Sequence, residues 1–365
     1  MNYKIISTEK DLFSYKKSWH TLYKKTDLLP FASFEWNAKW YSKAYNTSLL
    51  YIIFIYESSL NSPLAICPMM IDKTGCLRFI ADTHSDYGDF IIDPSIKSYK
   101  YNEIMKKIAE AIQNEPAIKS IEFKNIAQKN RNIGLFSSLL DYKKIIYQSN
   151  AVSFKKIGPK QNLFDNFDYL SSKQRSELKR VYKKHSNLKR VIYDIRANEF
   201  PKSLIEEIVE DMIMNNIRDK NFLNKTLLEV IESLYNEGTM IISSLVDENR
   251  RALAMNLILK SRDKSAYLFW IDIYRDIPYI NLSSYLYFIE WLTLNKKEPF
   301  TIDFGRGLYD YKTKNFIPDI ELQFTLYYAK NNFDFIKYLI KLSTLLSIKN
   351  FYKKNKSVIN KVLHR

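Results

Sequence analysis

Glycine and cysteine are scarce in this chain, which has seven glycines and two cysteines among 365 residues. Neither Cys67 nor Cys76 has a further cysteine or a histidine at metal-ligand spacing, so we expect no metal site and no disulfide framework. The sequence also lacks a glycine-rich nucleotide loop and a serine nucleophile elbow with histidine and aspartate partners. These absences argue against metalloenzymes, kinases and serine hydrolases, and they favour a reducing compartment.

Long apolar runs are absent as well. No stretch reaches the roughly 18 uncharged apolar residues that a membrane-spanning helix requires. The first residues, MNYKIISTEKDLFSYKK, do not contain the apolar core of a signal peptide. We therefore expect a cytoplasmic protein, and we leave peripheral membrane contact open.

Positive charge and aromatic side chains are abundant. The chain has 56 basic and 40 acidic residues, a net charge of +16, and 15% of its residues are aromatic. A hydrophobic fraction of 46% is typical of a folded protein, and the length is sufficient for two domains with separate cores. The charge suits a polyanionic partner, such as nucleic acid, an anionic membrane, a nucleotide sugar or coenzyme A.

The order of the predicted elements is repeated in the two halves of the chain. Each half shows a strand, two helices, three or four strands in meander order, a helix and two further strands. This order predicts an α+β fold of two tandem modules, each a mixed, mostly antiparallel sheet flanked by helices, with a substrate cleft between them. We expect an N-terminal module at 1–170, a basic connecting helix at 171–190, a C-terminal module at 191–330 and a basic C-terminal helix at 331–365.

Each of the two basic helices has two interpretations. Residues 171–190 hold eight basic residues against one acid, Glu177. This helix is either a solvated connector or a flank for an anionic ligand at the domain boundary. The C-terminal helix either docks on the protein body or contacts an anionic membrane surface. Its apolar residues on or near one face are Phe335, Leu339, Leu342, Leu345 and Leu346.

Four short patterns occur in an order that resembles a known family. They are PFASFEW from Pro30, SDYGDF from Ser85, LSSKQRSELKR from Leu170 and DFGRGLYDYK from Asp303. Together they resemble the tandem acyltransferases of the GNAT superfamily, of the BioF2-like and CelD-like kind, and more distantly the Fem peptidyltransferases. The chain departs from the family pattern at the acidic pair after the glycine, and at the Ser-Pro-Gly that usually opens the cofactor helix. The residues found there are Leu308 and Tyr309, and Ser283, Ser284 and Tyr285.

The resemblance implies acyl-CoA as co-substrate. In a GNAT-like fold two adjacent strands diverge and the pantetheine arm lies between them; here these would be residues 265–274 and 300–305. The pyrophosphate would lie at the start of the helix 282–295, where free N–H groups and the helix dipole favour anions. Alternatively, the serines there only cap the helix. The implied cofactor-binding residues are Trp270, Ile271, Ile280, Asn281, Leu282, Ser283, Ser284 and Lys312.

The acceptor amine must lose a proton as it attacks, so a carboxylate or histidine nearby would serve as general base. Asp303, at a strand end before Gly305 and Gly307, is our first candidate. In the other interpretation Asp303 pairs with Arg306 or Lys312 and only orders the turn. The glycines would allow the unusual dihedral angles and close approach that this corner needs. The remaining catalytic candidates are Asp272, His84 and Asp86 as base, and Tyr311 as proton donor to the thiolate.

The family resemblance also implies an acceptor. We expect an N-acyltransferase that acylates the amine of a dTDP- or UDP-linked deoxyamino sugar for surface polysaccharide, without nucleic acid, as a monomer or dimer. The alternatives are a Fem-like transferase that uses aminoacyl-tRNA, and a noncatalytic basic protein that binds nucleic acid or membrane. The candidate substrate-binding residues are Trp36, Tyr87, Asp89, Arg175, Arg306 and Tyr309.

Overall fold

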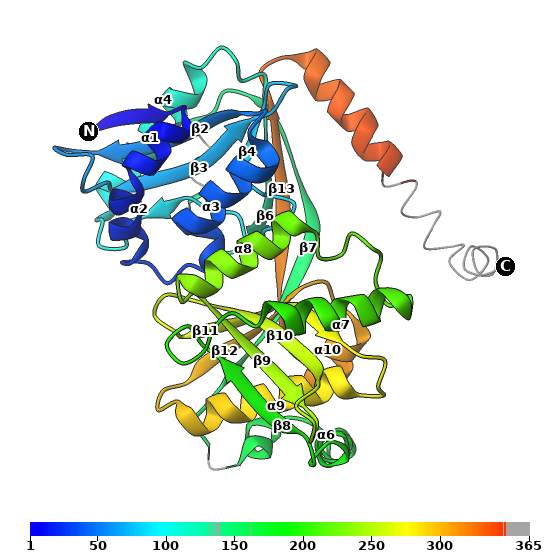
Figure 1. Cartoon of the computed structure of the whole chain (residues 1–365). Helices are drawn as coiled ribbons and strands as arrows, with labels where there is room; N and C mark the ends of the chain where they lie inside the picture. Colours follow the sequence, from blue (N-terminus) through cyan, green and yellow to red (C-terminus); the bar gives the residue numbers. More distant parts are fainter. Residues whose placement is uncertain (131, 134–135, 137–138, 161, 346, 348–365) are drawn as a thin grey trace.

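The N-terminal half combines a twisted sheet with helices on its two faces (Figure 1). The structure, a computed structural model, describes residues 1–130, 132–133, 136, 139–160, 162–345 and 347. The helix α4 covers one sheet face because its apolar residues recur at helical spacing. The elements of this half are β1 (Asn2–Ile6), α1 (Glu9–Ser14), α2 (Lys16–Tyr23), α3 (Phe34–Trp40), β2 (Leu49–Tyr56), β3 (Ala65–Ile71), β4 (Cys76–Phe79), β5 (Ile91–Ile92), α4 (Ser98–Gln113), β6 (Ser120–Ala127) and β7 (Lys143–Ile157).

The C-terminal half repeats this arrangement, as the sequence predicts. Two helices precede a three-stranded meander, and a buried helix follows it. The short helix α10, directly after the DFGRG segment, was not predicted. The elements are α6 (Ser172–Lys184), β8 (Lys189–Tyr193), α7 (Lys202–Met214), α8 (Lys225–Asn236), β9 (Met240–Val246), β10 (Ala252–Lys260), β11 (Ala266–Tyr274), α9 (Ile280–Asn295), β12 (Phe300–Arg306), α10 (Asp310–Phe316) and β13 (Asp319–Ala329).

One sheet runs through both halves. Its strand order is β1-β2-β3-β4-β6-β13-β7-β12-β11-β10-β9-β8, with β5 beside β3. The pairs β4–β6 and β11–β12 are parallel, and the other neighbours are antiparallel. The α+β prediction with a mixed, mostly antiparallel sheet is therefore confirmed.

The last strand does not lie where the sequence placed it. We expected it to close the C-terminal half, but β13 lies between β6 and β7 and pairs with both. Its side chains Leu326 and Tyr328 are buried in the core of the N-terminal half, which explains the position. The strand β7 in turn pairs with β12. The two halves are thus joined by β7 and β13 at the centre of the sheet.

Helix packing joins the halves a second time. The largest buried cluster contains residues from both, and α3 packs against α8. The ring centroids of Trp36 and Trp270 lie 5.3 Å apart across this boundary. Because interiors are close-packed, a shared core of this kind holds the halves in one relative position.

Both basic helices are present, with different bounds from those predicted. The connecting helix is α6, which begins after a capping box of Ser171 and Gln174 and ends at Lys184, before β8. The C-terminal helix covers 332–345, and Leu346 and residues 348–365 of the predicted segment lie outside the described residues. Within the described chain, no helix combines the length and the apolar character needed to cross a membrane.

Candidate functional site

The parallel strands β11 and β12 diverge and leave a slot between them. They pair only from Ala266 to Leu268 against Thr301 to Asp303. A cavity of about 400 Å³ lies beyond, between residues 269–272 of β11 and 304–307 after the pairing ends. We call this cavity the slot. Its other lining residues are Asp86, Asn150, Arg218, Phe222, Tyr309, Tyr311 and Lys312.

Two glycines shape the end of β12. Gly305 and Gly307 have φ values of +71° and +87°, which only glycine adopts at low cost. A Cβ on Gly305 would also lie 3.0 Å from Asp86 Oδ2. The concentration of glycine at this strand end thus has a geometric cause. The end of β12 bends sharply and packs closely against Asp86 of the N-terminal half.

Asp303 is buried directly before residues 304–307 of the slot wall, and its own side chain lines a neighbouring cavity and not the slot. Its carboxylate accepts a hydrogen bond from the Tyr87 hydroxyl at 2.5 Å and from the Gly305 N–H at 2.7 Å. Burial raises the pKa of Asp303 to about 7. The ion pair at this corner joins Arg306 to Asp86 instead, with Nε and Oδ1 2.6 Å apart. Asp303 therefore changes protonation near neutral pH, as a general base requires.

The turn that faces Asp303 comes from the SDYGDF segment. The indole of Trp36 donates to Ser85 Oγ at 3.1 Å, and the side-chain amide of Gln323 donates to the carbonyl of Asp86 at 2.7 Å. These contacts hold Tyr87 against Asp303. His84, a predicted base, stacks instead on Trp40 with ring centroids 3.9 Å apart and does not line the slot. Burial lowers its pKa.

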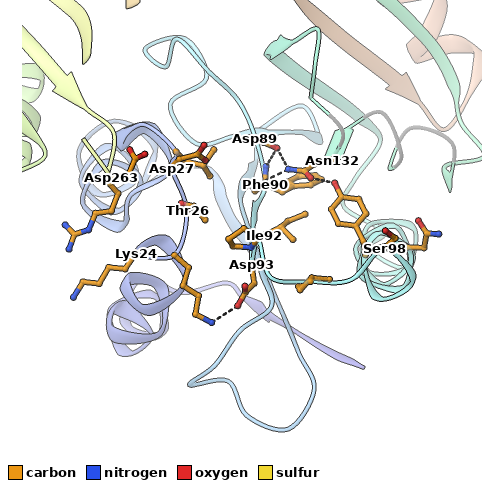
Figure 2. A pocket seen from close by; sticks show the side chains of 17 residues that line it. Lys24, Thr26, Asp27, Asp89, Phe90, Ile92, Asp93, Ser98, Asn132 and Asp263 are labelled. Carbon is orange, nitrogen blue, oxygen red and sulfur yellow. Dashed lines mark hydrogen bonds and ion pairs between the residues drawn. The ribbon is translucent and has the colours of Figure 1, made fainter. Parts of the chain in front are cut away.

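Two further cavities lie on the N-terminal side of Asp303. An inner chamber of about 540 Å³ is lined by Asp303 and Tyr87 together with Phe31, Phe79 and other residues. An outer chamber of about 1240 Å³ lies beyond it (Figure 2). Both chambers share the lining residues Asp27, Leu28 and Asp89. The carboxylate Asp303 consequently faces the inner chamber, and the residues that follow it in the chain, 304–307, line the slot.

The outer chamber is polar and contains both signs of charge. Asp89 accepts from the Asn132 amide at 2.7 Å, and burial raises the pKa of Asp89 to about 6. Lys25 pairs with Asp93 at 2.5 Å (Figure 2). Lys24 and Arg262 also line the wall, the latter from the β10–β11 turn of the C-terminal half. This mixture of carboxylates, amides and cations suits a ligand with hydroxyl and phosphate groups.

A buried group of polar side chains lies on the β11 side of the slot, around Asp272. Asp272 accepts from the Tyr285 hydroxyl at 2.5 Å and from the Asn256 amide at 2.9 Å. Burial raises the pKa of Asp272 and lowers that of Lys312. The Lys312 ammonium donates to the backbone carbonyls of Phe304 and Arg306. It thereby places a positive charge at the slot.

Tyr311 lies beside this group, with its hydroxyl 3.4 Å from that of Tyr285. Burial raises the pKa of Tyr311. Tyr309 is more exposed and lies at the mouth of the slot. Trp270 and Ile271 line the slot on β11.

The remaining predicted residues lie apart from the slot lining. Helix α9 begins at Ile280, after Tyr279 in a left-handed conformation, and not at Leu282. Ser283 and Ser284 are buried, and their hydroxyls donate to the carbonyls of Val181 and Asn281. None of the residues from Ile280 to Ser284 lines the slot. Arg175 lies on α6 and is also absent from this lining.

Several lining residues were missed by the sequence analysis. Asn150, Arg218 and Phe222 reach the slot from β7 and from the segment between α7 and α8. These segments carry no motif. Phe31 and Ala32, which line the inner chamber, belong to the PFASFEW pattern, and this pattern was an available signal for them.

One group of side chains in the described part of the chain has the spacing of a metal site. Ligand atoms of His20, Glu35 and Glu237 lie within 4.8 Å of one another. The Lys16 ammonium lies 3.2 Å from Glu35 and 3.7 Å from Glu237. A lysine thus supplies positive charge where a metal cation would bind.

Comparisons with known proteins place the fold. No family model matches the chain, and no curated protein matches its sequence. Among solved structures, L-PGS from Bacillus licheniformis has a TM-score of 0.59 at 13% identity over 94% of this chain and 99% of that one. FemX has a TM-score of 0.54 at 11% identity, over 88% and 97%. A tandem GNAT protein from the clavulanic acid biosynthesis pathway has a TM-score of 0.51 at 7% identity, over 91% and 100%. At these identities the likeness concerns the fold alone, which this chain shares with these proteins, among them a tandem GNAT protein.

Proposed function

We propose that this protein is an acyl-CoA-dependent N-acyltransferase. The observation that carries the proposal is the open slot between β11 and β12, which begins where their pairing ends at Asp303, a buried carboxylate with a pKa of about 7. Beyond Leu268 the edge of β11 no longer pairs with β12. An extended chain with amide groups, such as the pantetheine arm, can pair with such an edge like an added strand. The thioester would then lie near Asp303.

The acceptor amine enters from the opposite side, through the outer and inner chambers. We propose a dTDP- or UDP-linked deoxyamino sugar, as used in surface polysaccharide. The apolar and aromatic wall of the inner chamber suits a sugar ring, and the polar outer chamber suits hydroxyl groups. Lys24 and Arg262 offer positive charge to a diphosphate. This arrangement separates the two anionic substrates on opposite sides of Asp303.

The chemistry is direct attack of the amine on the thioester. The amine nitrogen forms a bond to the carbonyl carbon, its proton passes to Asp303, and the carbon–sulfur bond breaks. Lys312 and the unpaired backbone amides of the slot stabilise the negative charge on the carbonyl oxygen. The thiolate takes its proton from Tyr311 or from Lys312, whose pKa is lowered by burial. Coenzyme A and an N-acyl sugar are the products.

Thiol release by the purified full chain tests the proposal. We would offer a panel of short acyl-CoA donors with UDP- and dTDP-amino sugars, each donor also being tested without an acceptor. Release that requires one donor and one acceptor is the expected result. If coenzyme A binds but no acceptor supports release, the sugar assignment is wrong. If coenzyme A does not bind, the donor assignment is wrong as well.

A second candidate is an aminoacyl-tRNA-dependent transferase of the Fem kind. The observation in its favour is the exposed basic face of α6, where Arg180 and Lys184 lie over the ring of Tyr279 at the start of α9. Such a face could bind RNA phosphates, and its binding would weaken steeply with salt. Filter binding of tRNA over a salt series separates this candidate from the first.

A further inference from the structure

The C-terminal helix at 332–345 is attached to the protein by one face. Tyr338 donates a hydrogen bond to Glu122 at 3.0 Å, and its ring stacks on Tyr327 with centroids 3.5 Å apart. Phe335 and Leu342 pack against the same cluster. Since these residues recur at helical spacing, they define an inner face that fixes the orientation of the whole helix.

The opposite face is apolar but uncovered. Phe333, Ile336 and Ile340 are 75%, 55% and 63% exposed. Their spacing of three and four residues forms one stripe along the helix. The helix projects from one end of the sheet (Figure 1). A group of large apolar side chains on an attached helix, turned away from the core, is typical of an interaction surface.

Positive charge accompanies the stripe. Lys337 and Lys341 are exposed and each directly follows a stripe residue, so they lie along one side of it. After residue 347 the sequence contains six more basic residues and no acidic residue: Lys349, Lys353, Lys354, Lys356, Lys361 and Arg365. A second copy of this chain, also of net charge +16, would bring lysines against lysines. An anionic surface has the complementary charge.

We propose that this helix docks the protein on an anionic lipid bilayer. Phe333, Ile336 and Ile340 enter the boundary between headgroups and acyl chains, while Lys337 and Lys341 contact anionic headgroups. The inner face remains bound to the protein, so docking requires no unfolding. The proposal is independent of the transferase activity, because it involves none of the residues that line the slot or the chambers.

Co-sedimentation of the full chain with lipid vesicles tests the proposal. We expect binding to vesicles of phosphatidylcholine with phosphatidylglycerol, and weaker binding to phosphatidylcholine alone or at high salt. The triple substitution Phe333→Ser, Ile336→Ser and Ile340→Ser should reduce the partition coefficient roughly tenfold or more. Lys337→Gln should reduce it about fivefold on the anionic vesicles, and Lys341→Gln by a similar factor.

A matched control carries Met214→Ser and Leu294→Ser, which remove exposed apolar side chains elsewhere on the surface. This control should bind like the unaltered protein, and thermal unfolding should show that all variants are folded. Equal sedimentation of the unaltered protein and the triple variant would overturn the proposal, as would failure of the unaltered protein to bind anionic vesicles. A dimer in light scattering that the triple substitution abolishes, without vesicle binding, would assign the stripe to a second copy instead.

Discussion

The two halves of the molecule contain the same pair of diverging parallel strands, but only one half leaves the gap open. In the N-terminal half β4 and β6 pair at Cys76–Leu77 and Ser120–Ile121, and then separate. In the C-terminal half β11 and β12 pair over three residues each and then separate. The first gap is occupied by the chain itself, whereas the second forms the slot.

The occupant of the first gap is the turn that contains Tyr87. The Gly88 N–H donates to the Asn125 carbonyl at 3.1 Å, and the Asn125 amide donates to the carbonyls of Asp82 and Ser85. The turn therefore replaces β4 along the edge of β6. One diverging pair thus supports a turn that faces Asp303, and the other provides space for a ligand. Substitutions in the two gaps should consequently affect different properties.

The largest expected effect is on activity in the open gap. Asp303→Asn removes the proposed base and should lower kcat/KM by a factor of about 100 to 10,000. For the unaltered enzyme kcat/KM should rise with pH through about 7, as Asp303 loses its proton. The control is Asp310→Asn, whose exposed carboxylate pairs with Lys314. Equal activity of both variants would show that Asp303 is not the base.

The same carboxyl should make stability depend on pH. Burial raises its folded-state pKa to about 7, above the value of about 3.9 in the unfolded chain. The folded protein therefore holds this proton more tightly, and the free energy of unfolding should fall as pH rises from about 4 to about 7, by at most about 4 kcal/mol. Denaturant unfolding at several pH values measures this slope. Asp303→Asn should flatten it, and an unchanged slope would contradict the assignment.

In the filled gap the expected effect is on stability. A Cβ at Gly88 would lie 2.6 Å from the Lys124 carbonyl oxygen and 3.0 Å from the Phe79 ring. Gly88→Ala should therefore cost about 1–3 kcal/mol through overpacking. Gly158→Ala is the matched control, since its nearest neighbour would be 3.9 Å away. Thermal unfolding compares them, and equal transitions would mean that the turn relaxes without cost.

The smallest effect concerns the start of α9. The Ser283 hydroxyl is buried and donates to the Val181 carbonyl at 3.3 Å. Ser283→Ala should leave coenzyme A affinity within about twofold, and should cost about 1 kcal/mol of stability for the lost hydrogen bond. Calorimetric titration with coenzyme A gives the affinity. A large loss of affinity at unchanged stability would show that the serine contacts the cofactor.

Most elements could be predicted from the sequence because their signals are local. In the repeated element order, α8 shows apolar residues at helical spacing and a glycine after its end, and β10 and β11 are apolar runs. The helix α10 was missed because its seven residues, DYKTKNF, show no clear apolar period. The pattern DFGRG correctly pointed to the end of β12, where glycine is required by the backbone.

The sequence by itself determined the repeated element order, the excess of positive charge and the unusual strand end at Asp303, since these follow from composition and short-range periodicity. Only the tertiary structure decided that β13 pairs with β6, that His84 stacks on Trp40, and that the Tyr87 hydroxyl meets Asp303 across 216 residues. The physical reason is that strand pairing and burial depend on partners distant in the chain. The raised pKa of Asp303 is likewise a product of burial, which no local pattern contains.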